Sequence, residues 1–157
     1  MANEESKTLT IERTFDAPIQ RVWQAWTDPK QIQQWWGPSG VTIPTCEWDP
    51  QPGGKLHIVM LAGEQLGELA GQRWPMQGIF KQVDDLKRLE FTNQAVDNDG
   101  NILIDGLTTV VFEGNDGKTK VTITAVAKPV APVAEQMIAG MEQGWNQQTD
   151  KLAEFVK

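Results

Sequence analysis

Hydrophobic and polar positions repeat with two different periods in the first part of the chain. Residues 8–15 alternate at every second position, which predicts a β-strand. Over residues 19–26 and again over 32–36, hydrophobic residues recur every three or four positions, which predicts two short amphipathic helices. Asp28 and Pro29 stand where the second helix should begin, and both residue types favour the start of a helix.

From residue 41 to residue 128 the pattern is that of strands separated by turns rich in Gly, Asp, Asn and Pro. Short connections predict that neighbouring strands pair antiparallel. The last hairpin gives the clearest signal, because hydrophobic residues and threonines alternate over 121–127. Segment 62–73 has no clear period and is expected to be a loop. The predicted strands are 41–48, 54–61, 74–83, 87–95, 104–113 and 118–128.

The C-terminal segment predicts one long amphipathic helix over residues 131–156. Its hydrophobic residues fall within one arc and its acidic residues fall opposite, so one face of the helix should be buried. With the sheet and the two short helices after the first strand, this helix predicts an α+β fold. The tryptophans of the short helices are expected to close one end of the sheet; they are Trp23, Trp26, Trp35 and Trp36.

Length and composition fit one domain over residues 1–157, in which residues 1–7 form a flexible tail. Hydrophobic residues make up 39% of the chain, and its 14 glycines bring the apolar share to about 48%, as in an ordinary globular protein. The single cysteine, Cys46, excludes an internal disulfide. The net charge of −7 argues against nucleic acid as a partner. The sequence shows neither a leader peptide nor a membrane-spanning run, so we expect a cytoplasmic protein that does not insert into membranes.

The inventory of reactive side chains excludes several kinds of catalytic site. His57 is the single histidine, so zinc and iron centres that need two histidines cannot be built within one chain. Tyrosine is absent, and no glycine-rich phosphate-binding motif or serine-nucleophile motif occurs. We therefore expect no metal and no cofactor, and any general acid or base must be a carboxylate, His57, Cys46 or a lysine.

Several longer motifs are spread over the chain. They are Phe15-Asp16-Ala17-Pro18, Val22-Trp23-Gln24-Ala25-Trp26-Thr27-Asp28-Pro29, Trp35-Trp36-Gly37-Pro38, Asp49-Pro50-Gln51-Pro52-Gly53-Gly54 and Gly140-Met141-Glu142-Gln143-Gly144-Trp145. In these motifs the chain resembles the activator of Hsp90 ATPase homologue 1-like family, which is named after the C-terminal domain of that activator. The family belongs to the START-like, Bet v 1-like superfamily, and the resemblance covers about residues 8–156.

The resemblance implies a helix-grip fold, in which a curved antiparallel sheet of six or seven strands wraps around the C-terminal helix. It also implies an apolar cavity between the sheet and that helix. Members of the wider superfamily bind lipids, hormones and polyketides, and a few catalyse cyclisation or hydration. An Hsp90-type chaperone is a further partner that the family name implies.

The walls of such a cavity should come from one strand and from one face of the C-terminal helix. Thioethers and indoles adapt to varied apolar shapes, so methionines and tryptophans on these two surfaces are candidates to bind a ligand. Plain packing in a filled core is the alternative. The predicted apolar wall consists of Trp74, Met76, Phe80, Met137, Met141 and Trp145.

Two polar residues, Gln148 and His57, are candidates to bind a polar group of the ligand. Gln148 falls near the centre of the apolar arc, where an amide is costly unless something bonds it; it faces a ligand or water, or it lies beyond the sheet edge. Alternation places His57 on the face of its strand opposite to Leu56 and Ile58. Histidine is the residue type whose unperturbed pKa lies nearest neutrality. The sequence leaves open whether His57 points into the cavity or towards solvent, where Glu47 could approach it.

Gly140 and Gly144 lie inside the predicted long helix, where each glycine costs about 1 kcal/mol relative to alanine. Either a strand or the second short helix approaches these positions closely, or the glycines make room for a ligand. Segment 62–73 could gate the cavity or simply connect two strands, and a mobile gating loop is the preferred interpretation.

Three classes of function remain. The first is non-catalytic binding of a small hydrophobic or aromatic molecule, for which a stress-related role is one option. The second is a protein-interaction module that assists an Hsp90-type chaperone. The third is an enzyme of the cyclase or hydratase type, which would need a buried acid or base such as His57. We rank them in this order, because no convergent catalytic set is visible and fold alone does not establish function.

Overall fold

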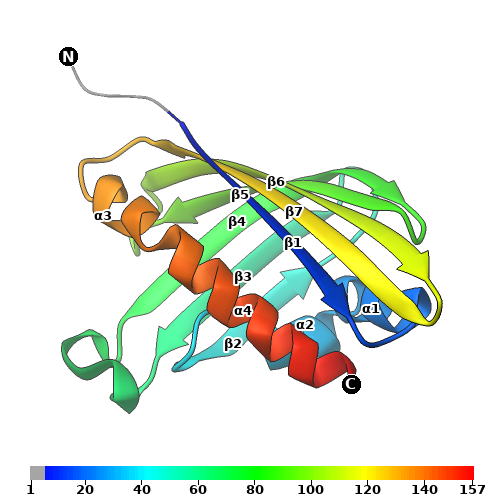
Figure 1. Ribbon diagram of the computed structural model, residues 1–157. Helices are drawn as coiled ribbons and strands as arrows, with labels where there is room; N and C mark the ends of the chain where they lie inside the picture. Colours follow the sequence, from blue (N-terminus) through cyan, green and yellow to red (C-terminus); the bar gives the residue numbers. More distant parts are fainter. Residues whose placement is uncertain (1–5) are drawn as a thin grey trace.

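Seven antiparallel strands form one sheet in the computed structural model, which describes residues 6–157 (Figure 1). The strand order is β1-β7-β6-β5-β4-β3-β2, so the first strand pairs with the last and all other neighbours are consecutive. This arrangement confirms the predicted antiparallel sheet. The strands are β1 Lys7–Phe15, β2 Val41–Trp48, β3 Lys55–Ala62, β4 Arg73–Asp84, β5 Arg88–Val96, β6 Ile102–Asn115 and β7 Lys118–Pro129.

Most of the segment expected to be a flexible tail, residues 1–5, lies outside the described residues. Lys7, which was included in that expected tail, already pairs with Ala127 in the first rung between β1 and β7. The ordered sheet therefore begins one residue earlier than the alternation of hydrophobic positions predicts.

Helices follow the first and the last strand, as the sequence predicts. The side chain of Asp28 caps the second helix by accepting a hydrogen bond from the N–H of Lys30 over 3.0 Å, and Pro29 occupies the first turn. The segment expected to be a loop, residues 62–73, contains a 3₁₀ segment, η1 Glu64–Leu69. The helices are α1 Ile19–Thr27, α2 Pro29–Trp35, α3 Ala134–Ala139 and α4 Met141–Val156.

The prediction of one uninterrupted helix over 131–156 is wrong. Helical structure begins only at Ala134, and it breaks at Gly140, whose φ of −91° and ψ of 1° depart from helical values. The N–H of Gly140 bonds the carbonyl of Met137 over 3.2 Å, which closes a tight last turn of α3. Glycine tolerates this break because it has the weakest preference for the helix after proline.

The core is filled at the end of the molecule where α1 and α2 lie. Trp26 and Trp35 are fully buried there, with their ring centroids 4.7 Å apart. Trp48 is bound to this pair, because its Nε1 donates a hydrogen bond to the backbone carbonyl of Trp26 over 2.8 Å. The tryptophans of the two short helices thus close this end of the sheet, as predicted.

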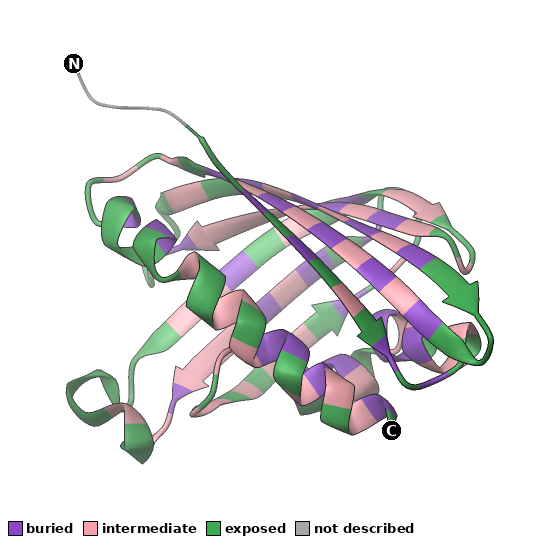
Figure 2. Cartoon of the chain, in the orientation of Figure 1, coloured by how far each residue is buried: buried purple, intermediate pink, exposed green. Residues whose placement is uncertain are grey.

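Towards the opposite end, Figure 2 shows α3 and the first turns of α4 as mostly exposed or intermediate. The buried residues of α4 begin only at Gln148, whereas Met141 and Trp145 in its first two turns are only partly buried. Figure 1 shows α4 crossing in front of the curved sheet, with α3 at the far end of the same diagonal. The space between these first turns of α4 and the sheet is where a site can form.

Candidate functional site

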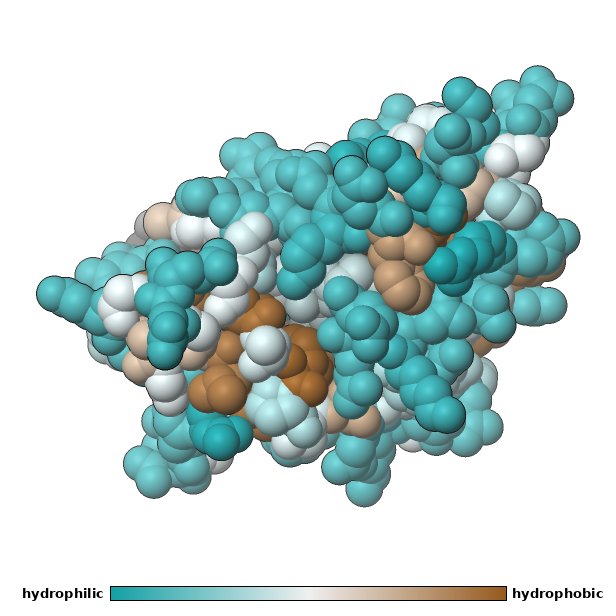
Figure 3. Space-filling view, turned by 90° about the horizontal axis from the view of Figure 1, so that it is seen from below, coloured by the Kyte–Doolittle hydropathy of each residue, from teal (hydrophilic) through white to brown (hydrophobic). Residues whose placement is uncertain are grey.

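A cavity of about 1040 Å³ lies between the sheet and the segment formed by α3 and the N-terminal half of α4. Most of the residues that line it are apolar, and they come from β4, β5, β6, β7 and both C-terminal helices. Seen from below, hydrophobic side chains gather in one part of the surface and hydrophilic ones surround them (Figure 3). The cavity is a largely apolar recess of the described chain.

Part of the cavity floor is formed by β6 and β7, where small residues stand at Gly106 and Ala127. The face of β6 on the concave side of the sheet has Phe112 and Val110 at the filled end and Gly106 at the cavity end. The paired positions of β7 follow the same order, because Val121 lies opposite Phe112 and Ala127 lies opposite Gly106. This gradient in side-chain size leaves the space that large residues fill at the other end.

The helical wall of the cavity contains the two glycines that stand out in the sequence. A Cβ placed on Gly144 would meet no atom within 4 Å, and one on Gly140 would meet only the carbonyl oxygen of Met137 at 3.8 Å. Close approach of a strand or helix, one of the two explanations, is therefore wrong. Gly140 and Gly144 both line the cavity, and they widen it.

Six of the eight residues predicted for the site lie around this cavity. Met76 is buried in the floor, whereas Met137 is 36% exposed at the rim. The indole of Trp145 stands 5.8 Å from that of Trp36, measured between ring centroids, where the cavity meets the filled core. The six residues are Trp74, Met76, Met137, Met141, Trp145 and Gln148.

Phe80, another predicted site residue, does not line the cavity. Its side chain is fully buried and packs against Trp48 and Phe91, with ring centroids 5.1 Å and 5.5 Å away. The alternation from Trp74 and Met76 correctly places Phe80 on the concave side of β4. However, the strand carries it past the cavity into the filled end of the core, so its role is packing.

His57 is also outside the cavity. Its neighbours Leu56 and Ile58 point into the core, so the imidazole lies on the opposite, outer face of β3. There His57 pairs across the hairpin with Glu47, and its Nδ1 stands 3.9 Å from the Glu47 carboxylate. The placement of His57 as a polar anchor in the cavity is therefore corrected, whereas the approach of Glu47 is confirmed.

Gln148 is buried in the wall of the cavity, with 5% of its surface exposed. Its Oε1 accepts a hydrogen bond from the backbone N–H of Gly37 over 2.8 Å. Because a backbone N–H can only donate, the amide oxygen must face Gly37 and the NH₂ group must point away from it. Among the described residues, Nε2 has no hydrogen-bond partner.

Gly37 holds its position through its own backbone conformation. With a φ of +89° it lies in the left-handed region that favours glycine, directly after α2. A Cβ there would stand 2.6 Å from Cγ2 of Val41, so no larger residue fits without movement. The turn after α2 thus presents its N–H to α4.

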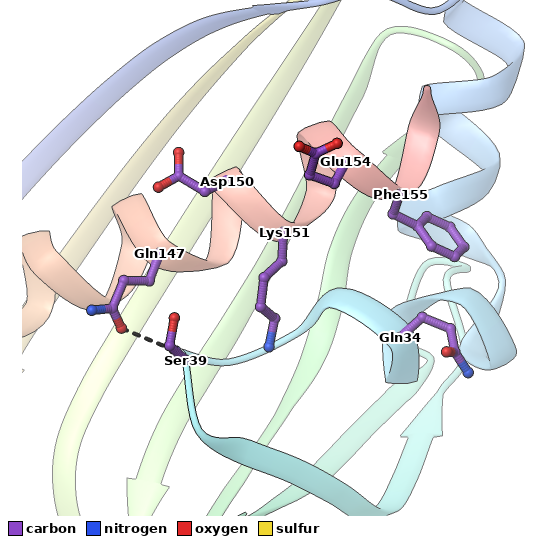
Figure 4. A pocket seen from close by; sticks show the side chains of 7 residues that line it. All are labelled: Gln34, Ser39, Gln147, Asp150, Lys151, Glu154 and Phe155. Carbon is purple, nitrogen blue, oxygen red and sulfur yellow. Dashed lines mark hydrogen bonds between the residues drawn. The ribbon is translucent and has the colours of Figure 1, made fainter. Parts of the chain in front are cut away.

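A second, smaller recess of about 500 Å³ lies on the other side of α4 (Figure 4). There the N–H of Ser39 donates to Oε1 of Gln147 over 3.0 Å, and Nζ of Lys151 donates to the carbonyl of Trp36 over 3.2 Å. Burial lowers the pKa of Lys151. These contacts tie α4 to the segment after α2. The lining residues, most of them polar, are Gln34, Ser39, Gln147, Asp150, Lys151, Glu154 and Phe155.

The described residues offer little to a catalytic or metal centre. Within residues 6–157, no group of three or more His, Cys, Asp or Glu side chains is arranged to hold a metal ion. Burial raises the pKa of the Cys46 thiol to about 11, so the thiol stays protonated and weakly nucleophilic near neutral pH. In the same part of the chain, no helix is long and apolar enough to cross a membrane.

Sequence reasoning missed most of the cavity floor and rim. Asn93, Ala95 and Ile104 contribute to the floor, and Leu69 and Asp97 contribute from the two loops beside it. The available signal was the loss of side-chain size along neighbouring strands. That signal becomes readable only when the register between β5, β6 and β7 is known.

A curved antiparallel sheet wrapped around a C-terminal helix, with an apolar cavity between them, defines an α+β protein of the helix-grip type. Solved structures share this fold. A crystal structure of a protein from Chromobacterium violaceum superposes with a TM-score of 0.79 at 24% identity, covering 95% of this chain and 96% of that one. The solution structure of a protein from Arthrobacter aurescens gives 0.77 at 27% identity, covering 95% and 85%.

Sequence comparison identifies the family. The family described as activator of Hsp90 ATPase homolog 1-like protein matches residues 16–157, and the chain belongs to it. A crystal structure described as the AHSA1 protein from Silicibacter pomeroyi agrees, with a TM-score of 0.75 at 24% identity over 94% of this chain and 96% of that one. No curated protein matches the chain. The resemblance seen in the sequence motifs is thus confirmed at the level of family and fold.

Proposed function

We propose that the protein binds a small hydrophobic or aromatic molecule in the cavity between the sheet and the C-terminal helices, without catalysing a reaction. The observation that carries this proposal is the empty space next to Gly144 in a helix that otherwise packs on the sheet. A glycine in a helix interior is destabilising by about 1 kcal/mol relative to alanine. Because the space beside Gly144 does not help the protein to fold, the loss of stability is explained if a ligand occupies that space.

The size and the lining of the cavity support binding rather than catalysis. Its volume of about 1040 Å³ is at the upper end of the roughly 300–1,000 Å³ usual for small-molecule sites. The described lining includes methionines and tryptophans, which adapt to apolar ligands, but no histidine, cysteine, lysine or glutamate. The one carboxylate of the described lining is that of Asp97, and hydrogen bonds from Asn101 lower its pKa, which makes it a weak general base near neutral pH.

The test is a titration of the purified protein with polycyclic aromatics, flavonoids, sterols and fatty acids, followed by tryptophan fluorescence and native mass spectrometry. We expect saturable binding of at least one apolar compound with a 1:1 stoichiometry. Gly144→Leu should weaken that binding at least about tenfold, because the new side chain fills the cavity.

Asn146→Leu is the matched control, since Asn146 is exposed on the same helix and does not line the cavity. This variant should bind the same compounds within about twofold of the unmodified protein. Failure of every compound to bind, or equal affinity in Gly144→Leu, would contradict the proposed function.

A second candidate is assistance to an Hsp90-type chaperone, which the description of the matching family supports. It would use the surface of the protein rather than the cavity. Co-purification with an Hsp90-type protein and stimulation of its ATPase activity would test it. Gly144→Leu should leave both unchanged if this role is independent of the cavity.

A further inference from the structure

We propose that Gln148 recognises the ligand, and that the ligand is an uncharged apolar molecule carrying a carbonyl or similar acceptor oxygen. In the bound state Nε2 of Gln148 donates a hydrogen bond to that oxygen. This inference rests on the proposed function, because it names the chemistry of the molecule that the cavity takes.

The orientation of the Gln148 amide leads to this assignment. Its Oε1 is held by the N–H of Gly37 over 2.8 Å, so the NH₂ group cannot exchange places with the oxygen without losing that bond. Nε2 is left as a buried donor without a partner among the described residues. A buried unpaired donor is unfavourable, and an acceptor oxygen supplied by a ligand would satisfy it.

The charges around the cavity argue against an ionised ligand. Of the described residues that line it, Arg73 and Asp97 alone carry a charge at neutral pH. Arg73 is the first residue of β4 and is exposed, so its guanidinium stays hydrated. The carboxylate of Asp97 is occupied by its own turn, where it accepts from the N–H of Asn101 over 2.8 Å.

Lys151 is the nearest lysine along α4, but it lines the recess on the other side of the helix and bonds the carbonyl of Trp36. Apart from Arg73, which is exposed, the described lining of the cavity contains no lysine or arginine. A carboxylate buried there would lack a counter-ion, which is costly. The net charge of −7 adds to the unfavourable field for an anion.

The test compares ligands of equal shape that differ in the acceptor oxygen. The probes are 2-acetylnaphthalene, its hydrocarbon isostere 2-isopropenylnaphthalene and the anion 2-naphthoate, with the matching biphenyl pair as a larger scaffold. Equilibrium dialysis at pH 7.5 gives the affinities. We expect the ketone to bind about five- to tenfold more tightly than the isopropenyl compound, as for one net hydrogen bond, and the carboxylate to bind more weakly than both.

Gln148→Met removes the donor while keeping the length of the side chain. In this variant the preference for the ketone over the hydrocarbon should fall to within twofold. Isotope-edited infrared spectroscopy of the unmodified protein provides a measurement that does not depend on the variant's folding. The carbonyl band of bound ¹³C-labelled ketone should lie at lower frequency than in hexane.

The outcomes separate the two proposals. Equal binding of ketone and hydrocarbon to the unmodified protein, a carbonyl band at its hexane frequency, or a ketone preference that survives in Gln148→Met would overturn the role of Gln148 while leaving the cavity as a binding site. Tighter binding of 2-naphthoate than of the ketone would overturn the assignment of an uncharged ligand. No binding of either scaffold would overturn both proposals.

Discussion

The backbone N–H of Gly37 donates to the side-chain oxygen of Gln148 over 2.8 Å, and this bond joins residues that lie 111 positions apart in the chain. It connects the turn after α2 to the middle of α4. The same bond directs the other end of the Gln148 amide away from Gly37. This contact has a structural role that can be measured separately from the recognition role proposed for Nε2.

The structural role predicts a loss of stability on substitution. Gln148→Met leaves the N–H of Gly37 buried without an acceptor, so the free energy of unfolding should fall by about 1 to 3 kcal/mol. Urea denaturation followed by tryptophan fluorescence measures this change. Gln147→Met is the control, because Gln147 makes the neighbouring bond to Ser39 at an exposed position. Its cost should stay below about 0.5 kcal/mol.

Replacement of two glycines by alanine, Gly144 and Gly78, should change the free energy of unfolding in opposite directions. Gly144→Ala adds a methyl group into open space within a helix, so it should raise the free energy of unfolding by about 0.5 to 1 kcal/mol. At Gly78 a Cβ would lie 1.8 Å from the carbonyl oxygen of Thr92, so Gly78→Ala should lower it by about 2 to 3 kcal/mol. Thermal unfolding of both variants tests this, and destabilisation by Gly144→Ala would show that the space is not free.

Arg13 is a charged residue on the inner side of β1, and the structure explains its position. Its Nη1 donates to the hydroxyl of Thr149 over 2.8 Å and lies 2.6 Å from the carboxylate of Asp150, which links β1 to α4. Arg13→Leu removes the partly buried guanidinium and its hydrogen bonds but keeps much of the aliphatic packing. We therefore expect the free energy of unfolding to fall by about 1 kcal/mol.

Asp150→Asn provides the comparison for Arg13→Leu. The carboxylate of Asp150 is 68% exposed, so loss of its charge should cost less than about 0.5 kcal/mol and the difference should shrink at high salt. A larger effect of Asp150→Asn than of Arg13→Leu in the same urea titration would show that the ion pair, not the bond to Thr149, holds the two elements together.

The strands and the helical faces could be predicted because they depend on local periodicity. The positions of β2 and of the hairpin formed by β6 and β7 follow directly from alternation in the sequence. The break at Gly140 was missed because the hydrophobic arc continues across it from Met137 to Met141. Periodicity reports which face is apolar, and it does not report whether the backbone stays helical.

The candidate site could be predicted only in part, for a physical reason. Met141, Trp145 and Gln148 share a helical face that one sequence suffices to define. The face of His57 could not be predicted, because Val59 and Leu61 on its side of β3 are as hydrophobic as the residues opposite. The depth of the cavity depends on which strand residues pair with one another, and such pairing is non-local.

The position of His57 leads to a last prediction, on the pH dependence of ligand binding. His57 lies on the outer face of β3, so the charge state of its imidazole should not affect the cavity. Asp97 lines the cavity, but hydrogen bonds from the backbone and side chain of Asn101 lower the pKa of its carboxyl group, which therefore stays ionised between pH 5.5 and pH 8. Binding of a neutral ketone such as 2-acetylnaphthalene should change less than twofold between these pH values.

His57→Gln should bind the same ketone with unchanged affinity at both ends of that range. A steeper pH dependence that His57→Gln abolishes would mean that the imidazole reaches the ligand, which contradicts the geometry of β3. A steep pH dependence that persists in His57→Gln would point to a titrating group in the cavity wall. Asp97→Asn would then show whether that group is the carboxylate of Asp97. Equilibrium dialysis at the two pH values separates these cases, because the uncharged probe does not itself titrate.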